Sequence, residues 1–360
     1  MAAADRLTAK RAGWRPTVTV VIPILNEALH IERCLRSVLA QDYPRELIDI
    51  VVADGGSSDG TQLVVRELAE AHDRIQLIDN PGRNQAAGLN RSIAASRGEV
   101  VARLDGHAEW RPGHLSRCVA ILEETGADNV GGTMEATGEN DTGEAIARAS
   151  SSPFGVGGAR YRYADHQMAT DTVWLGCFRR VALDRVGPFN EALPQHEDYE
   201  LNHRILASGG QVVFSPDLPT RYWTRSSWSA LLLQFFRYGR AKARVARQNP
   251  KVVRPYHLVP VAFTGALLVG AATPRTRPAV AALALAYAVV CVGAAIPAGV
   301  GSRPGVKVRI PLAFAGMHLA WGTGFWSGLL GSASASLAPF AGARANQEPV
   351  PDHQHTVNPN

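Results

Sequence analysis

The chain has 360 residues, and its 37 Lys and Arg against 32 Asp and Glu give a net charge of +5. The four cysteines are far apart and form no Cys-x-x-Cys pair, which argues against a disulfide framework or a structural zinc site and fits a reducing compartment. Residues 1–16 are basic but have no apolar core, so they lack the pattern of a signal peptide, and we expect the polar part of the chain to stay in the cytoplasm.

Residues 17–136 alternate between β-branched apolar runs and helical patterns. Strands are expected at 17–23, 47–53, 74–80, 99–105 and 128–136, and helices at 28–41, from the glycine-rich turn after 53 to about 71, at 84–98, and from 112. In the first helix Ile31, Leu35, Val38 and Leu39 share one face. This rhythm predicts an α/β fold with a largely parallel sheet and helices on both faces.

Residues 137–170 are rich in Gly and Ser with little periodicity, and we interpret them as a mobile loop. Beyond them the pattern predicts a strand at 172–178, a helix at 194–210, short strands at 211–214 and 220–223, and an amphipathic helix at 226–248.

Three apolar segments then follow, at 256–273, 279–300 and 310–330. Each approaches or reaches the ~20 residues needed to cross a bilayer, although the first is short and contains Pro260, so a re-entrant hairpin with the second is an alternative. Buried helices of a soluble protein are the other reading. The expected division of the chain is an extension (1–16), a catalytic domain (17–225), an amphipathic basic interfacial helix (226–255), a membrane region with about three transmembrane helices (256–331) and a disordered tail (332–360).

The basic run at 237–254 precedes the first apolar segment and contains no acid. A juxtamembrane anchor to anionic lipids explains it best; a nucleic-acid patch and a solvated helix face are the alternatives. Basic residues before the first segment and at 303–309 favour a cytoplasmic location for both stretches, while Arg275 and Arg277 oppose this topology.

Polar residues follow the predicted strands, where ligands bind in open parallel sheets. They are Asn26 and Glu27, Asp54, residues 80–83, and Asp105 to His107. We therefore expect them on one edge of the sheet.

Several motifs occur in the order typical of one family: "VIPILNE", "SVLAQDYP", "IVVADGGSSDGT", "NQAAGLNRSIAASRGEVVARLDGHA" and "HEDYEL". The sequence resembles family 2 glycosyltransferases over about residues 17–245, and most closely the membrane-bound exopolysaccharide (succinoglycan-type) glucosyltransferases. The resemblance implies an inverting enzyme with a GT-A domain, a Rossmann-like nucleotide-diphospho-sugar transferase fold, followed by C-terminal transmembrane helices.

The resemblance implies a nucleotide site on the first two loops. Asp54 matches the Asp that contacts uracil, but Gly55 replaces the usual second Asp, and an N-capped glycine turn is the alternative. Pro23, Asn26 and Glu27 match the family's Pro-x-x-Asn-Glu, although Glu27 also suits the first turn of a helix. Arg83 is positioned to meet a phosphate, or else is an exposed loop residue.

Asp105-Gly106-His107 resembles the family's Asp-x-Asp with His in the last position. Mn²⁺ or Mg²⁺ needs few protein ligands beside a sugar-nucleotide diphosphate, because phosphate oxygens and water fill the remaining positions. A carboxylate with an imidazole suits Mn²⁺. We therefore predict a variant metal site formed by Asp105 and His107, and the alternative is a turn with a capping Asp.

An inverting transfer also needs a carboxylate beside the acceptor hydroxyl. Asp198 matches the family's base, Glu197 is its neighbour, and Glu200 is the next candidate. A solvated acidic helix start is the alternative.

"QFFRYGR" resembles the Gln-x-x-Arg-Trp motif of processive members. Gln234 and Arg237 lie one helical turn apart; Arg237 would hold the diphosphate and Tyr238 would stack on an acceptor sugar. An interfacial helix with aromatic anchors is the alternative.

These features and the resemblance predict a metal-dependent inverting glycosyltransferase that moves a hexose from a nucleotide sugar, which we expect to be UDP-linked, to a lipid-anchored glycan acceptor, without a nucleic-acid partner. A polyprenyl-phosphate sugar synthase and a catalytically inactive membrane scaffold are the alternative interpretations.

Overall fold

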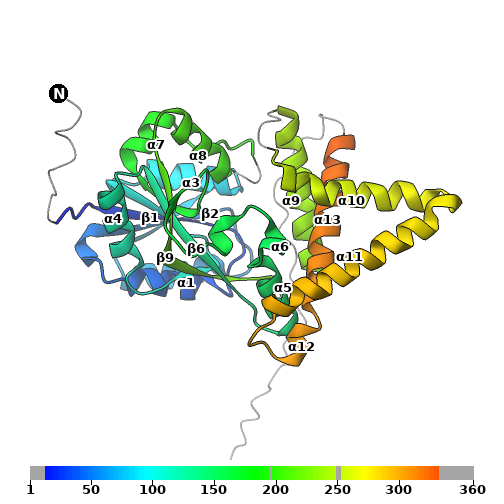
Figure 1. The fold of residues 1–360 in the computed structure, drawn as a ribbon. Coiled ribbons are helices and arrows are strands. Elements are labelled where there is room, and N and C mark those ends of the chain that lie inside the picture. The colour runs from blue at the N-terminus through cyan, green and yellow to red at the C-terminus, as the bar shows by residue number, and fades with distance from the viewer. Residues whose placement is uncertain (1–12, 194–196, 249–252, 332–360) are drawn as a thin grey trace, which may run out of the picture.

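The computed structural model describes residues 13–193, 197–248 and 253–331. Its centre is a sheet of nine strands in the order β3-β2-β1-β4-β8-β6-β9-β5, with β7 paired to β9 (Figure 1). The strands are β1 (Val18–Ile24), β2 (Ile48–Asp54), β3 (Ile75–Asp79), β4 (Val100–Arg103), β5 (Ala108–Trp110), β6 (Asn129–Thr137), β7 (Met168–Ala169), β8 (Trp174–Arg179) and β9 (Val212–Trp223). The helices around this sheet are α1 (Ile31–Leu39), α2 (Thr61–Ala71), α3 (Gln85–Ala94), α4 (His114–Thr125), α5 (Asp141–Ser150), α6 (Pro153–Val156), α7 (Arg180–Val186) and α8 (Glu197–Ala207).

The first half of the sheet is parallel, as the sequence predicts. β1 pairs with β2 and with β4, and β2 pairs with β3, all in parallel register. β1 is buried along its whole length because helices cover both faces, and this explains its continuous apolar sequence. Ile31, Leu35 and Val38 of α1 are buried as expected, whereas Leu39 is partly exposed.

The second half of the sheet is mixed, which differs from the largely parallel sheet that we expected. β8 runs antiparallel to β4 and β6, and β5 runs antiparallel to β9. The two short strands expected at 211–214 and 220–223 form one strand, β9. Its pairing with β6 shifts in register across residues 216–219, where two prolines fall, so a bulge accommodates the residues that looked like a break.

The interpretation of residues 137–170 as a mobile loop is wrong for much of the segment. Helix α5 begins at a cap in which the Asn140 side chain accepts a hydrogen bond from the Gly143 N–H at 2.8 Å. Its buried face consists mainly of small residues and packs against the C-terminal helices. Small side chains give a weak helical pattern, and this explains why the sequence did not indicate the helix.

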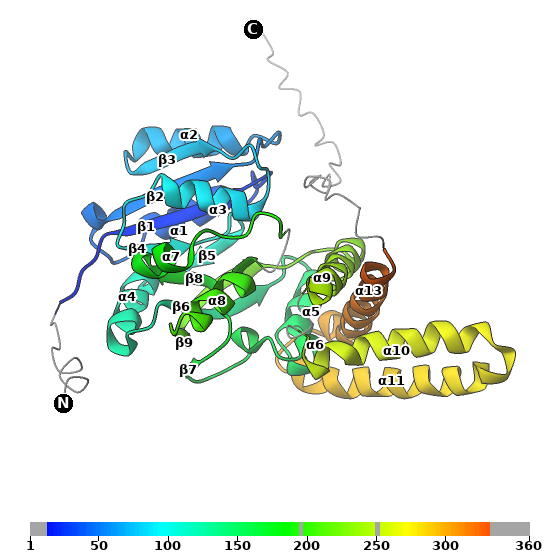
Figure 2. The same ribbon diagram turned by 90° about the horizontal axis from the view of Figure 1, so that it is seen from above.

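The C-terminal part is entirely helical. It comprises α9 (Trp228–Gln248), α10 (Pro255–Ala272), α11 (Arg277–Ala298), α12 (Pro304–Lys307) and α13 (Ile310–Leu330). Helices α9 and α13 lie side by side (Figure 2). Their backbones approach so closely that a Cβ at Gly239 would collide with the Trp321 carbonyl, and one at Gly324 with the Phe236 carbonyl.

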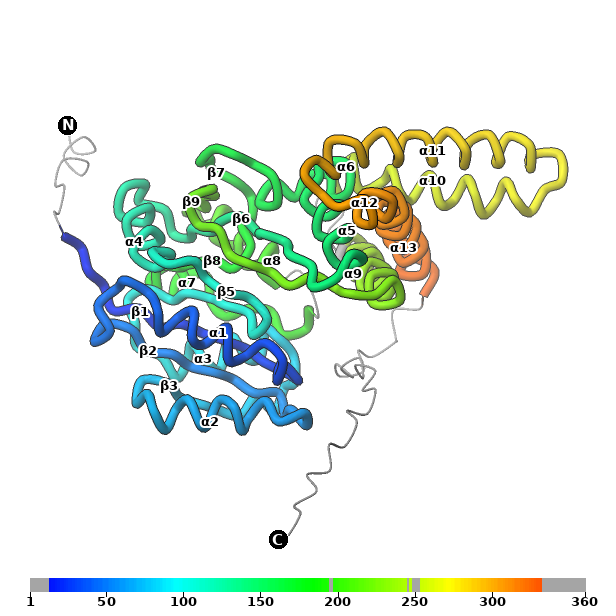
Figure 3. The backbone as a smooth tube through the Cα atoms, turned by 90° about the horizontal axis from the view of Figure 1, so that it is seen from below, coloured from blue at the N-terminus to red at the C-terminus, as the bar shows by residue number. Residues whose placement is uncertain are grey.

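Helices α10 and α11 form a hairpin that projects away from the rest of the molecule (Figure 3). Within the described part of the chain, two helical segments, Pro255–Ala272 and Pro274–Ala298, are long and apolar enough to cross a membrane, and both are largely exposed. The sequence predicted about three. Helix α13 packs along α9 and buries one side against it, and its place in the membrane stays a prediction. The disordered tail expected at 332–360 lies outside the described residues, as do residues 1–12 of the extension.

Candidate functional site

The carboxyl ends of β1, β2 and β4 bring the first group of predicted residues to one edge of the sheet. Asn26 and Glu27 follow β1, Asp54 ends β2, and Asp105 lies two residues beyond β4. Because β1 lies between the other two strands, these ends are neighbours. The structure therefore assembles the polar edge that the sequence predicts.

The loops after β1 and β2 are joined by hydrogen bonds. The Asn26 side chain accepts from the Ser58 N–H at 2.9 Å, and the Asn26 N–H donates to Ser57 Oγ at 2.8 Å. One residue further, the Glu27 N–H donates to Thr61 Oγ1 at 2.8 Å. Asn26 has a left-handed backbone with φ of 58°, a strained conformation that these bonds hold in place.

Asp54 is 2% exposed, and its carboxylate accepts hydrogen bonds from the loop and helix that follow it. Its Oδ2 accepts from the backbone N–H groups of Gly56 and Ser57, both at 2.9 Å, and from Gln62 Nε2 at 2.6 Å. The carboxylate thus shapes the turn, and its contact with a nucleotide base stays a prediction.

Two further predicted residues lie at the same edge. Pro23 is buried in β1 and contacts α3, where a Cβ at Gly88 would come within 2.9 Å of the Pro23 ring. Arg83 is exposed, and its guanidinium lies beside Gly56 in the β2–α2 loop. Pro23 thus supports the loop from within, whereas Arg83 is free to reach a ligand.

Arg103, the last residue of β4, links the predicted metal and base carboxylates. It is 5% exposed; its Nε donates to Asp105 Oδ1 at 3.1 Å, and its Nη1 donates to Glu197 Oε1 at 3.0 Å. Gln85 Nε2 also donates to Asp105 Oδ1, at 2.9 Å. Asp105 Oδ2 has no hydrogen-bond partner within the described residues and is available to a ligand.

His107 pairs with Glu27. Its Nδ1 donates to Glu27 Oε1 at 2.8 Å. Burial alone would lower the pKa of His107, but the Glu27 carboxylate outweighs it and raises the pKa to about 9. Gly106 allows this approach, because a Cβ there would lie 2.8 Å from Ile24 Cγ2 and 3.1 Å from Glu27 Cγ.

The three acidic residues at the start of α8 have different surroundings. Glu197 is buried and bound by Arg103, whereas Glu200 forms an i,i+4 pair with Arg204 at 2.9 Å. Asp198 is partly exposed and forms no ion pair with a described residue. Burial raises the pKa of Asp198, and Arg103 opposes the rise. A partly accessible carboxylate with a raised pKa suits a general base.

Two of the three predicted residues of α9, Gln234 and Tyr238, are linked through Tyr222 to His107. Gln234 Nε2 donates to the hydroxyls of Tyr238 at 2.9 Å and Tyr222 at 3.3 Å, and the Tyr222 ring lies edge-on to His107 with centroids 5.4 Å apart. Arg237 is exposed instead. Residues four apart lie nearly above one another on a helix, which explains why Gln234 aligns with Tyr238 better than with Arg237.

Comparison with known proteins supports one family. The profile described as Glycosyl transferase family 2 matches residues 19–187. Succinoglycan biosynthesis protein ExoA of Rhizobium meliloti (strain 1021) is 31% identical over 318 residues, which are 86% of this chain and 94% of the relative. The chain belongs to glycosyl transferase family 2.

Two other proteins are informative about this glycosyltransferase. A dolichyl N-acetyl-alpha-D-glucosaminyl phosphate 3-beta-D-2,3-diacetamido-2,3-dideoxy-beta-D-glucuronosyltransferase of Methanococcus voltae is 28% identical over 240 residues, 64% of this chain and 74% of the relative. The mannosyltransferase PcManGT of Pyrobaculum calidifontis, solved with GDP-Man and Mn²⁺, is 23% identical, with 86% of this chain and 87% of that chain covered and a TM-score of 0.55. The latter likeness shows the GT-A fold.

The donor set of this glycosyltransferase fits a divalent cation. No three His, Cys, Asp or Glu among the described residues converge to hold a metal by themselves. Asp105 Oδ2 and His107 Nε2 nevertheless have no hydrogen-bond partner in the described structure, and Nε2 offers a lone pair once the imidazole loses its proton. A metal-ligating histidine commonly donates its other ring N–H to a carboxylate, and Glu27 occupies that position.

Sequence reasoning missed three residues of the site: Gln85, Arg103 and Tyr222. The only signal for Arg103 was a charge at the end of a buried strand, and such a charge needs partners. Gln85 and Tyr222 offered no signal, because their partners are distant in the sequence. Asp105 lies 20 positions from Gln85, and His107 lies 115 positions from Tyr222.

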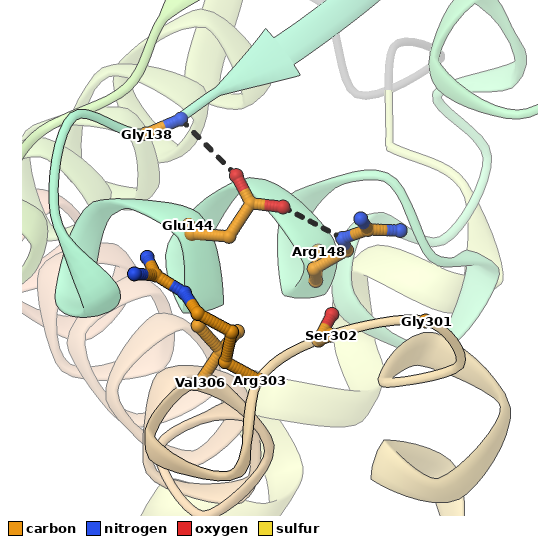
Figure 4. Close-up of a pocket in the computed structure, with 7 residues that line it drawn as sticks. All are labelled: Gly138, Glu144, Arg148, Gly301, Ser302, Arg303 and Val306. Carbon is orange, nitrogen blue, oxygen red and sulfur yellow. Dashed lines mark hydrogen bonds and ion pairs between the residues drawn. The ribbon is translucent and has the colours of Figure 1, made fainter.

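Two cavities lie elsewhere. One of about 190 Å³ lies where α5 meets the turn before α12, and there Glu144 accepts from the Gly138 N–H and from Arg148 (Figure 4). The other, about 470 Å³, is an apolar groove between α9 and α13. Neither is lined by the predicted site residues.

Proposed function

We propose that this glycosyltransferase is metal-dependent and inverting, and that it moves a hexose from a UDP-linked donor to a lipid-anchored glycan. The observation that carries the proposal is the bridge through Arg103, which joins the Asp105 carboxylate to Glu197, the neighbour of Asp198. This bridge holds the proposed cation-binding carboxylate and the start of the helix that carries the candidate base around one guanidinium.

The chemistry follows from that arrangement. Asp198 accepts the proton of an acceptor hydroxyl while the oxygen of that hydroxyl bonds to the anomeric carbon. The bond from that carbon to the donor diphosphate breaks on the opposite face, which inverts the configuration. Asp105 and His107 would hold Mn²⁺ or Mg²⁺, which supplies positive charge to the leaving diphosphate. Glu197 orients Arg103 and is not free to take the proton.

The proposed acceptor and location rest on the C-terminal helices and the relatives. Two exposed apolar helices suit a multi-pass membrane protein, and the basic segments beside them favour a cytoplasmic catalytic domain. The name of the Methanococcus relative describes transfer to a sugar on dolichyl phosphate, which supports a lipid-linked acceptor.

The test measures UDP release and sugar transfer by the full chain in native membranes, with a panel of sugar nucleotides and Mn²⁺. Asp198→Asn is expected to lower transfer by roughly 10²–10⁴-fold, because the proton acceptor is lost, while UDP affinity stays within several-fold. Glu200→Gln is the matched control on the same helix, because Glu200 is engaged by Arg204.

A comparable loss of UDP affinity in Asp198→Asn would remove Asp198 from this role. Wild-type protein without any transferase activity across the panel would favour the inactive-scaffold interpretation. A product with the sugar directly on polyprenyl phosphate would favour the synthase.

A further inference from the structure

Lys242 of α9 is a buried positive charge that the proposed chemistry does not use. Only 6% of its surface is exposed, and its Nζ lies 4.8 Å from the centroid of the Tyr199 ring. It makes no hydrogen bond or ion pair with any residue that the structure describes. An ammonium removed from water without a directly bonded partner is costly, so its position needs an explanation.

The surroundings of Lys242 lie between the base and the membrane helices. Tyr199 directly follows Asp198 on α8, and both Asp171 and Asp198 are close enough to oppose the effect of burial, which lowers the pKa of Lys242 to about 8. On the other side, Arg254 pairs with Asp171 at 3.5 Å and immediately precedes α10. Figure 1 shows α8 on one side of α9 and α10 leaving from the other.

The metal end of the site has a different set of charges. Glu27 and Asp105 act on His107, whereas Asp171, Arg254 and Asp198 act on Lys242. A donor diphosphate held by Asp105 and His107 therefore leaves Lys242 without a partner. An anion that binds Lys242 directly would then belong to the acceptor.

We propose that Lys242 binds the phosphate or diphosphate of the lipid-linked acceptor and so presents the acceptor hydroxyl to Asp198. This subsite rests on the proposed function, because it requires an acceptor with a lipid anchor. Such a molecule keeps its hydrocarbon in the bilayer, its phosphate at the surface and its sugar above it. Lys242 lies between the start of α10 and Asp198, which matches that order.

The experiment uses the full chain in detergent and farnesyl diphosphate as the probe, with farnesol as its uncharged counterpart. Lys242→Met is expected to weaken farnesyl diphosphate binding by about 10-fold or more, because a charge-assisted hydrogen bond is lost. UDP binding in the presence of Mn²⁺ stays unchanged. Arg247→Gln, which removes an exposed charge from the same helix, binds both ligands as wild type does.

Thermal unfolding separates this role from packing. Lys242→Met is expected to unfold at or above the wild-type temperature, because a buried unpaired charge is removed; Lys242→Gln makes the same comparison if the Met variant does not fold. A lower unfolding temperature with unchanged farnesyl diphosphate affinity would mean that Lys242 only packs on Tyr199, and would overturn the subsite.

Two other outcomes also overturn it. Loss of UDP affinity in Lys242→Met would assign the lysine to the donor. Equal, Lys242-dependent binding of dihexanoyl phosphatidylglycerol would make this a general lipid-headgroup site. In each case wild-type UDP release and sugar transfer remain intact, which distinguishes failure of the subsite from failure of the proposed function.

Discussion

The buried guanidinium of Arg103 forms ion pairs with two carboxylates that are far apart in the sequence. Asp105 follows it in sequence, whereas Glu197 lies 94 positions away. Removing one partner of such a buried group leaves an uncompensated charge, typically at a cost of about 3–5 kcal/mol. Arg103 therefore fixes the separation between the proposed metal-binding and proton-accepting ends of the site, and it holds α8 against the sheet.

The pKa of His107 predicts how the proposed metal binding depends on pH. Because Glu27 raises the pKa of His107 to about 9, the imidazole is protonated at neutral pH, and a cation must displace that proton. The Mn²⁺ concentration for half-maximal activity is expected to fall about tenfold per pH unit from pH 7 to 8.5. In Glu27→Gln the pKa falls and this dependence flattens. Activity measured against Mn²⁺ at several pH values provides the check.

Substitutions at the ligands complete that experiment. His107→Ala should need more metal at every pH, while His107→Asp should retain metal-dependent activity to lower pH, because a carboxylate keeps its charge to roughly pH 4. Asp105→Ala should be worse than either. If His107→Ala titrates with Mn²⁺ like wild type, His107 is not a ligand.

Sequence motifs located the separate parts of the site but not their connections. Asp105, His107, Glu197 and Asp198 were each recognisable because they match motifs of the family that the sequence resembles. The pairings of Arg103 with Glu197 and of Glu27 with His107 depend on how β1, β4 and α8 come together in space. Local patterns contain no information about contacts 80 or more residues apart.

At the scale of elements, the contact between α9 and α13 depends on glycine. In Gly324→Leu the new side chain would collide with the Phe236 backbone, so the helices must separate. Overpacking of this kind typically costs about 1–3 kcal/mol, and we expect thermal unfolding several degrees below wild type. Gly293→Leu in α11 is the matched control, because a Cβ there meets no atom within 4 Å. Equal unfolding temperatures for the two variants would contradict the close packing.

The same helices show which elements a sequence reveals. Strands β1 to β4 and helix α1 were predicted because long apolar side chains mark their buried faces. Helix α5 was missed because alanine and glycine supply much of its buried face, and the partner that buries it, α13, comes more than 150 residues later. The expectation that α13 is a third transmembrane span stays a prediction, because hydrophobicity alone does not distinguish burial in protein from burial in lipid.

At the scale of the molecule, the α10–α11 hairpin should cross the bilayer and place its tip opposite the catalytic domain. Thr276→Cys at that tip is expected to react with an impermeant maleimide only from outside the cell, whereas Glu70→Cys on α2 reacts only in inside-out vesicles. The natural cysteines are all buried and give a low background. Labelling of both positions from the same side would instead establish a re-entrant hairpin.

Helix α13 packs on α9, although the α10–α11 hairpin separates the two helices in the sequence. During synthesis, α9 must wait with its glycine-lined face uncovered until the ribosome has made residues 255–309 and then α13. The proposed membrane hairpin is therefore synthesised before the helix carrying Gln234, Tyr238 and Lys242 is fixed in place. If the hairpin inserts as proposed, insertion is a step in maturation, because the apolar surface of an uninserted hairpin stays exposed to water.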